Sequence, residues 1–325
     1  MEERIDIRPF DAERFTEELR ETASAIGAGF DEAKVRKTLE VFAPEFHGNP
    51  VQLKTTTRPN DGLYYRYFYL GPIDHTPRAQ EAGLLETGNS PVLRLQNEIL
   101  ANCPGSSRGG VDFDTGYGLA KIWTFTHAGT SVEELCSRVS VIPDSVRAAL
   151  ELFRHFGLER LSGVATDYRH RGMSLYFRWD LELRTVSWLK AFGHAVGGEV
   201  PSTETCYDIL ATQRNFGALA TTFCWDRPGL LRWAPYSFEI PYDEPAEDMH
   251  RPALPHRLQL LYRAPTLNPE PQYNVSWSFG RAGAYMKLEK SYARDARYGM
   301  RRDTGADLSP ARSIPLPELN QALAG

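Results

Sequence analysis

Cysteines are few and scattered in this chain of 325 residues. The four of them, Cys103, Cys136, Cys206 and Cys224, form no Cys-x-x-Cys pair. This spacing predicts neither a zinc site nor a disulfide framework, and it fits a reducing compartment. Residues 1–10 carry charges where a secretory signal peptide would be apolar, and no uninterrupted apolar run reaches membrane-spanning length. We therefore expect a cytoplasmic protein.

An excess of charge of either sign is also missing. The chain has 37 Lys and Arg residues against 42 Asp and Glu residues, a formal net charge of −5. This balance gives no global electrostatic reason to bind nucleic acid or an anionic membrane. A cluster of cations in such a chain would therefore be a local device.

What the sequence does have is a repeated pair of β-rich runs. Residues 164–168 and 173–179 show the pattern, with Gly172 in the polar connection between them. Side chains alternate between the two faces of a strand, so the second run has an apolar face and a mixed face. The apolar face holds Met173, Leu175, Phe177 and Trp179, and the mixed face holds Ser174, Tyr176 and Arg178. Taken alone, this pattern is typical of a hairpin with one face toward solvent.

Similar pairs of runs recur along the chain at intervals of roughly 50 residues, with helical segments between them. The other pairs are residues 51–57 with 63–70, 111–114 with 119–126, 215–225 with 230–240, and 273–279 with 284–292. Helical spacing and capping residues predict helices over residues 11–30, 31–42, 90–103, 143–156, 185–196, 202–212 and 256–262.

No linker rich in Pro, Gly or Ser separates the repeats, so residues 1–325 are predicted to form a single α+β domain. We expect one closed barrel of about ten antiparallel strands, because closure removes exposed strand edges. If the helices pack against the apolar face of each hairpin, the other faces line a central chamber wide enough to hold a ligand.

The second strand of each hairpin is predicted to place one cation on its inner face, usually beside an aromatic residue. Besides Arg178 in the third hairpin, the sets that share a face are Tyr64, Arg66 and Phe68; Leu119, Lys121, Trp123 and Phe125; Leu230, Arg232 and Ala234; and Tyr285, Lys287 and Glu289. Buried cations need a compensating anion, so this ring predicts a polyanionic ligand of the size of a diphosphate. Aromatic walls favour a flat or apolar second ligand and can stabilise a carbocation. Together they suggest an allylic diphosphate and an aromatic acceptor.

Two other classes of protein could use such a chamber. A non-catalytic carrier for an aromatic metabolite would need the apolar walls but not the converging cations. A phosphate-ester binding protein or hydrolase would need the cations, but the sequence contains no P-loop and no HExxH motif to support one.

Several blocks of the sequence resemble one known family. Residues 151–160 (ELFRHFGLER) and 166–177 (TDYRHRGMSLYF) are similar to the signature region of the soluble ABBA-fold aromatic prenyltransferases, of the clorobiocin, naphterpin and phenazine pathway type. Four further segments are similar to the remaining blocks of that family: residues 55–59 (TTTRP), 121–123 (KIW), 223–228 (FCWDRP) and 285–289 (YMKLE). The resemblance covers nearly the whole chain.

The resemblance implies a PT barrel, in which ten antiparallel strands are ringed by helices in repeated αββα units. It implies a monomeric enzyme that transfers a prenyl group, dimethylallyl or geranyl, from its diphosphate to an aromatic secondary metabolite by Friedel-Crafts-type substitution. Tyr64 stands where magnesium-dependent members carry an aspartate, and Arg66 adds a positive charge there. We therefore expect neither a cofactor nor a metal, with Arg66 doing the electrostatic work of the ion. The absence of a DDxxD motif argues against terpene synthases and membrane prenyltransferases.

The resemblance also assigns site residues by position. The expected diphosphate-binding residues are Arg66, Lys121, His170, Ser174, Tyr176, Arg232, Tyr285 and Lys287. Among them, His170 replaces a family lysine or arginine, and an ordinary histidine of a surface turn is its alternative reading. Lys121, Arg232 and Lys287 are the expected catalytic cations, and Glu289 is either a base or acceptor anchor or the partner of a salt bridge. The expected aromatic and prenyl pocket comprises Tyr64, Phe68, Trp123, Gly163, Phe216, Gly217, Ala218 and Trp277.

Overall fold

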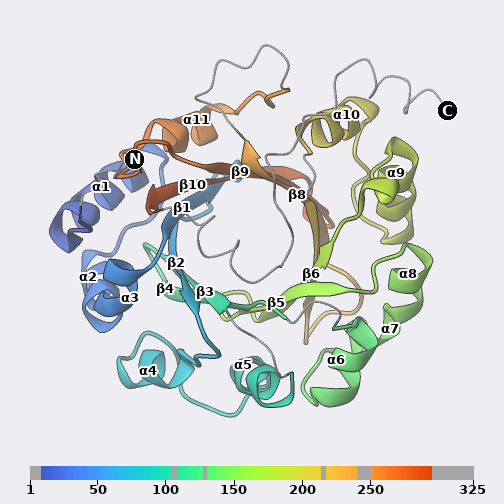
Figure 1. Cartoon of the computed structure of the whole chain (residues 1–325), viewed down its shortest axis with the longest axis horizontal. Coiled ribbons are helices and arrows are strands. Elements are labelled where there is room, and N and C mark those ends of the chain that lie inside the picture. Colours follow the sequence, from blue (N-terminus) through green and yellow to red (C-terminus); the bar gives the residue numbers. More distant parts are fainter. Residues whose placement is uncertain (1–8, 104–107, 127–129, 214–216, 241–249, 295–325) are drawn as a thin grey trace, which may run out of the picture.

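Ten strands form one closed antiparallel barrel in the computed structural model, which describes residues 9–103, 108–126, 130–213, 217–240 and 250–294. Consecutive strands pair with each other, and β1 closes the ring by pairing with β10 (Figure 1). The strands are β1 (Val51–Thr56), β2 (Tyr64–Leu70), β3 (Arg108–Asp114), β4 (Gly118–Thr124), β5 (Leu161–Asp167), β6 (Gly172–Arg178), β7 (Gly217–Cys224), β8 (Arg232–Ile240), β9 (Tyr273–Gly280) and β10 (Tyr285–Ala293). The predicted α+β barrel is confirmed.

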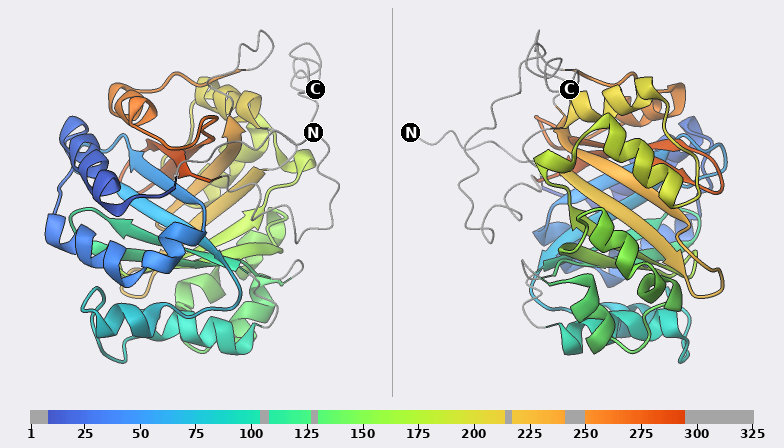
Figure 2. Two further views of the ribbon diagram at one scale, coloured as in Figure 1. Left: turned by 60° about the vertical axis from the view of Figure 1, so that its left-hand side comes forward. Right: turned by 90° about the vertical axis from the view of Figure 1, so that its right-hand side faces the viewer.

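The helices form a layer outside the barrel, and the two turned views of Figure 2 also show helices packed along the outside of the strands. They are α1 (Ala12–Ala25), α2 (Glu32–Val41), α3 (Ala43–Gly48), α4 (Thr76–Glu81), α5 (Pro91–Asn102), α6 (Val132–Arg138), α7 (Asp144–Ala148), α8 (Leu150–His155), α9 (Val186–Ala195), α10 (Thr203–Thr212) and α11 (His256–Arg263), with a short 3-10 helix at Leu181–Leu183. Among the described residues, no helix has both the length and the apolar character needed to cross a membrane.

Side-chain caps fix where the first helices begin. The carboxylate of Asp11 accepts a hydrogen bond from the N–H of Arg14, and Asp31 caps α2 in the same way. The predicted helix over residues 143–156 is two short helices, α7 and α8, which meet at Ala149. Helices α3, α4 and α6 were not predicted because they span 6, 6 and 7 residues, too short to show a helical period.

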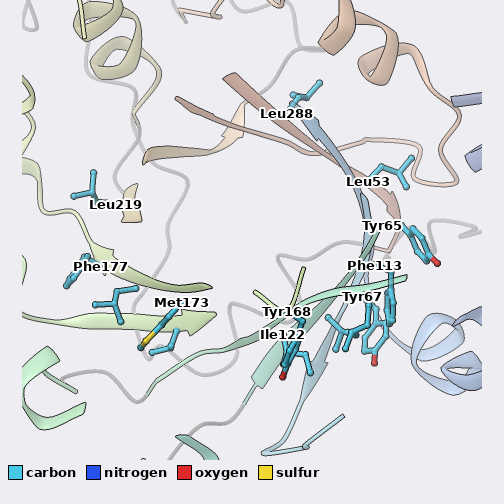
Figure 3. Close-up of a cluster of buried hydrophobic side chains, with 14 of the residues drawn as sticks. Leu53, Tyr65, Tyr67, Phe113, Ile122, Tyr168, Met173, Phe177, Leu219 and Leu288 are labelled. Atoms are coloured by element: carbon cyan, nitrogen blue, oxygen red, sulfur yellow. The ribbon is translucent and has the colours of Figure 1, made fainter. Parts of the chain in front are cut away.

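The main hydrophobic core lies between the barrel and the helices. Figure 3 shows ten of its labelled side chains around the outer face of the strands, including Leu53, Tyr65, Phe113 and Leu288. Tyr65 and Phe113 are cross-strand partners on β2 and β3, and their rings stack with centroids 5.5 Å apart. Because this outer layer buries most of the apolar side chains, the inner face of the barrel can carry polar and charged groups.

A β-bulge in β4 corrects one prediction about the inner face. Asp112 pairs with Lys121, whereas its neighbour Phe113 pairs with Leu119, so Ala120 is an extra residue. The extra residue reverses the alternation, and Leu119 therefore joins the outer core while Lys121 points inward. Strict alternation had placed Leu119 and Lys121 on one face.

Three further predictions about the inner face are wrong. Arg178 lies at the end of β6 with 70% of its side chain exposed and pairs with Asp180, so the second strand of the third hairpin sends no cation inward. Leu230 precedes β8 and is buried in the outer core. Trp277 also belongs to the outer core, because the inward positions of β9 are those of its neighbours, including Ser278, which lines the cavity described below.

Candidate active site

Charges of alternating sign face one another across four neighbouring strands on the inside of the barrel. Arg66 on β2 is opposite Asp112 on β3, Asp112 is opposite Lys121 on β4, and Lys121 is opposite Asp167 on β5. Arg66 Nε lies 2.8 Å from Asp112 Oδ1, and Lys121 Nζ lies 3.1 Å from Asp167 Oδ2. All four side chains are buried. The strand register therefore produces a row of ion pairs.

A second group of ion pairs joins β10 to this row. Glu289 Oε1 lies 3.3 Å from Arg66 and 3.2 Å from Lys287 Nζ, and Lys54 Nζ lies 2.5 Å from Asp112. Burial alone would raise the pKa of Glu289, but the charges of Arg66 and Lys287 hold it well below its usual range. Burial lowers the pKa of Lys54 to about 8 despite the attraction of Asp112. Each of these cations already has a carboxylate partner.

A cavity opens beside these pairs toward the end of the barrel where the hairpin turns lie. Arg58 and Asp61 of the β1–β2 turn, His170 of the β5–β6 turn, and Arg232 and Tyr285 at the starts of β8 and β10 all line it. The remaining lining residues are Lys54, Thr56, Tyr64, Asp112, Ala120, Lys121, Trp123, Asp167, Tyr176, Ala220, Thr222, Ala234, Tyr236, Ser278 and Lys287. Five of these lining residues are lysines or arginines, so this is a cationic cavity.

Another part of the barrel interior is apolar and adjoins the charged groups. A separate inner cluster comprises Ala165, Tyr176, Ala218, Ala220, Ala234 and Tyr236, with Trp123 and Phe238 packed against it. The rings of Trp123 and Tyr176 stack with centroids 4.7 Å apart, and the Arg66 guanidinium lies 4.7 Å from the Trp123 ring. Ala220 and Ala234 are cross-strand partners, and their small side chains leave space beside the aromatic rings. The interior thus joins a charged side to an aromatic side.

His170 is held by Asp167 at the edge of the cavity. Its Nδ1 lies 3.1 Å from Asp167 Oδ1, and its backbone N–H donates to the same oxygen at 2.9 Å. Burial alone would raise the pKa of Asp167, but Lys121 and the hydrogen bond from His170 depress it far below its usual range. The histidine is therefore oriented by a buried carboxylate, although half of its side chain is exposed.

Arg232 is bound differently from the other buried cations. Its Nε donates to Thr222 at 3.1 Å, and its Nη1 donates to the hydroxyl of Tyr285. Within the described residues, no carboxylate forms a salt bridge with it. This guanidinium is the cavity cation with the least internal charge compensation.

The structure gathers eight of the predicted site residues around the cavity: Tyr64, Lys121, Trp123, His170, Tyr176, Arg232, Tyr285 and Lys287. Three others, Arg66, Ser174 and Glu289, are buried and do not line it. Arg66 is 1% exposed between Asp112 and Glu289, and Ser174 is fully buried and hydrogen-bonded to Thr222 at 2.9 Å. The structure thus places Arg66 and Ser174 behind the cavity wall, and their contact with a diphosphate stays a prediction.

The remaining predicted pocket residues lie elsewhere. Phe68, Gly163, Gly217 and Ala218 do not line the cavity, and Ala218 instead belongs to the inner apolar cluster. Trp277 is in the outer core, as noted above. Phe216 lies outside the described residues.

Sequence reasoning missed most of the first-strand residues of the cavity. Lys54, Arg58, Asp61, Asp112 and Asp167 all line it and come from β1, β3, β5 and the first turn. These residues were missed because the alternation of side chains was considered only for the second strand of each hairpin. Applied to first strands, the spacing of Lys54 from Thr56 and of Ala165 from Asp167 marks their inner faces.

An antiparallel barrel ringed by helices, with a cationic and aromatic interior, is the architecture of the ABBA-fold prenyltransferases. Residues 10–300 match the sequence profile of the family described as aromatic prenyltransferase Orf2. The chain is 34% identical over 285 residues to 4-hydroxyphenylpyruvate 3-dimethylallyltransferase of Streptomyces niveus, covering 87% of this chain and 85% of that protein. It is 29% identical over 286 residues to an aromatic prenyltransferase of Sclerotinia sclerotiorum, covering 87% and 91%. The chain belongs to the aromatic prenyltransferase family, whose members transfer a prenyl group to an aromatic acceptor.

Solved structures agree with this fold. The 5-dimethylallyltryptophan synthase of Streptomyces coelicolor superimposes with a TM-score of 0.53 at 11% identity, covering 86% of this chain and 96% of that one. A 6-dimethylallyl tryptophan synthase superimposes with a TM-score of 0.56 at 14% identity, covering 85% and 95%. At these identities the likeness concerns the barrel alone.

Proposed function

We propose that the protein transfers a dimethylallyl group from dimethylallyl diphosphate to an electron-rich aromatic acceptor, without a metal ion. The observation that carries this proposal is the cavity itself, where five cations meet an aromatic and alanine-rich wall. A carrier for an aromatic metabolite would have no use for the cationic side. Family membership likewise favours the enzyme.

The diphosphate binds on the cationic side in this proposal. Lys54, Arg58, Lys121, Arg232 and Lys287 all line the cavity. As the allylic C–O bond breaks, negative charge grows on the departing diphosphate, and fixed positive groups stabilise it without having to reorganise. Arg232 has the largest expected share, because its charge is not already neutralised by a carboxylate of the described chain.

The prenyl group lies against the aromatic wall. The stacked pair of Trp123 and Tyr176 presents π faces that stabilise a carbocation. Ala220 and Ala234 leave room beside these rings for a short chain. The name of the Streptomyces niveus relative supports dimethylallyl as the first donor to test.

The acceptor ring attacks the allylic cation and then loses a proton. The same relative makes 4-hydroxyphenylpyruvate the first acceptor to test, because a phenol is electron-rich. Glu289 is a poor candidate for the base, since Arg66 and Lys287 hold its pKa well below its usual range and Asn274 also donates to it. Its contacts are those of the alternative reading, in which Glu289 is the partner of a salt bridge.

Metal independence is part of the proposal. Each carboxylate that lines the cavity is already bonded to a cation: Asp61 to Arg58, Asp112 to Lys54 and Arg66, and Asp167 to Lys121. In the described parts of the chain, no group of three or more His, Cys, Asp or Glu side chains is placed to hold a metal ion. A metal would have to displace these partners.

The experiment is a product assay by liquid chromatography and mass spectrometry. Purified protein is incubated with dimethylallyl or geranyl diphosphate and one of a panel of acceptors: 4-hydroxyphenylpyruvate, phenols, naphthols, phenazines, indoles and quinolones. We expect the mass of at least one acceptor to increase by one dimethylallyl group. The yield should be the same with and without EDTA. No product with any acceptor would refute the proposed activity, and loss of product with EDTA would refute metal independence.

A further inference from the structure

Tyr64 and Tyr285 occupy equivalent places in two repeats of the barrel, but only the hydroxyl of Tyr64 is bonded to a carboxylate within the described residues. Each is the first residue of the second strand of its hairpin, β2 or β10, and each lines the cavity. Tyr64 donates its hydroxyl proton to Asp61 Oδ1 at 2.8 Å and accepts a hydrogen bond from Arg169 at 3.0 Å, so a carboxylate already holds that proton. The hydroxyl oxygen of Tyr285 also accepts a hydrogen bond from an arginine, Arg232, but no carboxylate of the described residues accepts its proton.

Cationic and neutral donors face Tyr285 from β8, from β9 and from the β1–β2 turn. Arg232 approaches from β8 and Ser278 from its cross-strand position on β9. The guanidinium of Arg58, in the β1–β2 turn, lies 4.4 Å from the centre of the ring, and Lys287 follows on the same strand. These groups favour a negative charge on the phenolic oxygen and leave its proton free to be given away.

The acidity of the four cavity phenols reflects these contacts. Burial raises the pKa of Tyr64, Tyr176 and Tyr236, with further increases from Asp61, from Tyr236 and from Glu289 respectively. Burial would raise the pKa of Tyr285 as well, but Arg232, Arg58, the Ser278 hydroxyl and Lys287 together lower it to about 8. Of these four phenols, only Tyr285 becomes more acidic than free tyrosine.

We propose that Tyr285 is a general acid that protonates the departing diphosphate. This inference rests on the proposed function. The allylic C–O bond breaks heterolytically, and both of its electrons stay on the diphosphate oxygen, which makes the diphosphate more basic. The hydroxyl proton of Tyr285 passes to a diphosphate oxygen, and the phenolate that remains lies between Arg232 and Arg58.

Protons are balanced over one catalytic cycle. The acceptor ring loses one proton to solvent as it regains aromaticity, and Tyr285 takes one proton back from solvent after the hydrogen diphosphate leaves. No oxidant, reductant or other reactant is needed. The other cavity cations are less suited to this step. Arg232 and Arg58 do not give up protons near neutral pH. The three lysines are each paired with a carboxylate: Lys54 with Asp112, Lys121 with Asp167 and Lys287 with Glu289.

The decisive variant is Tyr285→Phe, which removes only the hydroxyl. Wild-type kcat is expected to fall above about pH 8, where Tyr285 has lost its proton. We expect Tyr285→Phe to lower kcat by about 10² to 10⁴-fold, the usual contribution of a general acid, and to abolish this alkaline limb. Tyr64→Phe is the matched control, because its hydroxyl proton is held by Asp61 and the alkaline limb should remain.

Two measurements do not depend on the folding of Tyr285→Phe. The ultraviolet absorbance of tyrosinate should reveal one phenol that titrates near pH 8 in the wild-type protein and in Tyr64→Phe. Arg58→Gln, a change at a side chain that is 41% exposed, should move the alkaline limb to higher pH by removing the charge above the ring.

The outcomes separate this inference from the proposed function. A wild-type protein that makes product but shows no tyrosinate near pH 8 overturns the role of Tyr285, as does a Tyr285→Phe variant with wild-type kcat or an unchanged alkaline limb. Lys54→Met tests the other cavity group whose pKa lies near 8, and loss of the limb in that variant alone also overturns the role of Tyr285. A wild-type protein that makes no product contradicts the proposed function, while the tyrosinate titration still reports on Tyr285.

Discussion

Lys121 on β4 and Asp167 on β5 are directly opposite each other, and their charged atoms lie 3.1 Å apart with less than a tenth of either side chain exposed. The same register places Asp112 between Arg66 and Lys121. The cations of the cavity are therefore largely compensated by the protein's own carboxylates before any ligand arrives. This compensation explains how a chain can bury so many charges on one inner face, since unpaired buried charges are strongly unfavourable.

The difference between paired and unpaired cations predicts two distinct kinds of loss. Lys121→Ala should reduce turnover and also destabilise the fold by about 3 to 5 kcal/mol, because it leaves Asp167 buried without its main partner. Arg232→Ala should reduce turnover with much less loss of stability, because its partners are the hydroxyls of Thr222 and Tyr285. Urea unfolding and steady-state kinetics on both variants measure the two effects.

A double variant that changes both Lys121 and Asp167 is the control for the predicted loss of stability. In Lys121→Met combined with Asp167→Asn, no buried charge is left alone, so much of the lost stability should return while turnover stays low. Equal destabilisation by Lys121→Ala and Arg232→Ala would contradict the difference in pairing that the structure shows.

Arg66 is predicted to matter for stability more than for direct binding of the donor. It is buried between Asp112 and Glu289 and stacks on Trp123. Arg66→Met should cost about 3 to 5 kcal/mol of unfolding free energy, because two carboxylates lose their shared partner. Arg58→Met, at a side chain that is 41% exposed, is the matched control and should cost less, because Asp61 keeps its hydrogen bonds from Thr56 and Tyr64. A stable Arg66→Met variant whose only defect is a raised KM for the donor would show that Arg66 contacts the diphosphate directly.

The barrel could be predicted from the sequence because its signals are local. Alternation, turn residues such as those of residues 58–62, and the recurrence of hairpins indicate the strands, and closure follows from the need to cover edges. The placement of Lys121, Arg232 and Lys287 at one cavity followed from the same alternation. The shortest helices, α3 and α4, carried too few residues for a periodic signal.

The rest of the site depends on contacts between distant segments. A one-residue bulge at Ala120 reversed the face of Leu119, and no residue type in that stretch marks it. The sequence showed a cation at Arg66 but not that Glu289, 223 residues away, would bind it and remove it from the cavity surface. Likewise, the carboxylate bonded to Tyr64 and the arginine bonded to Tyr285 are contacts that depend on how the chain folds around each phenol.

His75 predicts an acid-dependent loss of stability outside the site. It is 1% exposed and packs edge-on against Tyr69 at 4.4 Å, with Phe42 and Tyr67 on other sides. Burial lowers its pKa to about 4, below the value of about 6.5 in an unfolded chain. The unfolded state therefore binds more protons between these values, so stability is complete above pH 6.5 and falls as the pH drops toward 4. The full contribution is about 3 kcal/mol.

Urea unfolding at pH 7, 5.5 and 4 measures this dependence. In His75→Leu, the free energy of unfolding should fall less steeply with decreasing pH than in the wild type. The control is His194→Gln, at an exposed position of α9, which should leave this pH dependence unchanged. The carboxylates of Asp167 and Glu289 act in the same direction but at lower pH, because their pKa values are depressed and their ion pairs are lost only as they protonate. An identical decline in His75→Leu and wild type would show that His75 is not neutral in the folded protein.

Arg257 on α11 is predicted to position the turn that carries Arg58 and Asp61. Its guanidinium donates to three backbone carbonyls, those of Ile26, Pro59 and Asp61, and so ties the β1–β2 turn to the end of α1. Arg257→Ala should destabilise the protein by about 1.5 to 3 kcal/mol, the range for hydrogen bonds to a charged group. It should also raise KM for the prenyl diphosphate more than it lowers kcat, because the turn no longer holds Arg58 at the cavity.

The matched control for this prediction lies on the same helix. Arg263 is exposed in the last turn of α11, so Arg263→Ala should change neither stability nor KM. Arg257→Lys keeps the charge but loses the planar fork that reaches several carbonyls at once, and it should recover only part of the donor affinity. If Arg257→Ala lowers stability while KM for the diphosphate stays at the wild-type value, Arg257 holds the fold together without positioning the cavity cations.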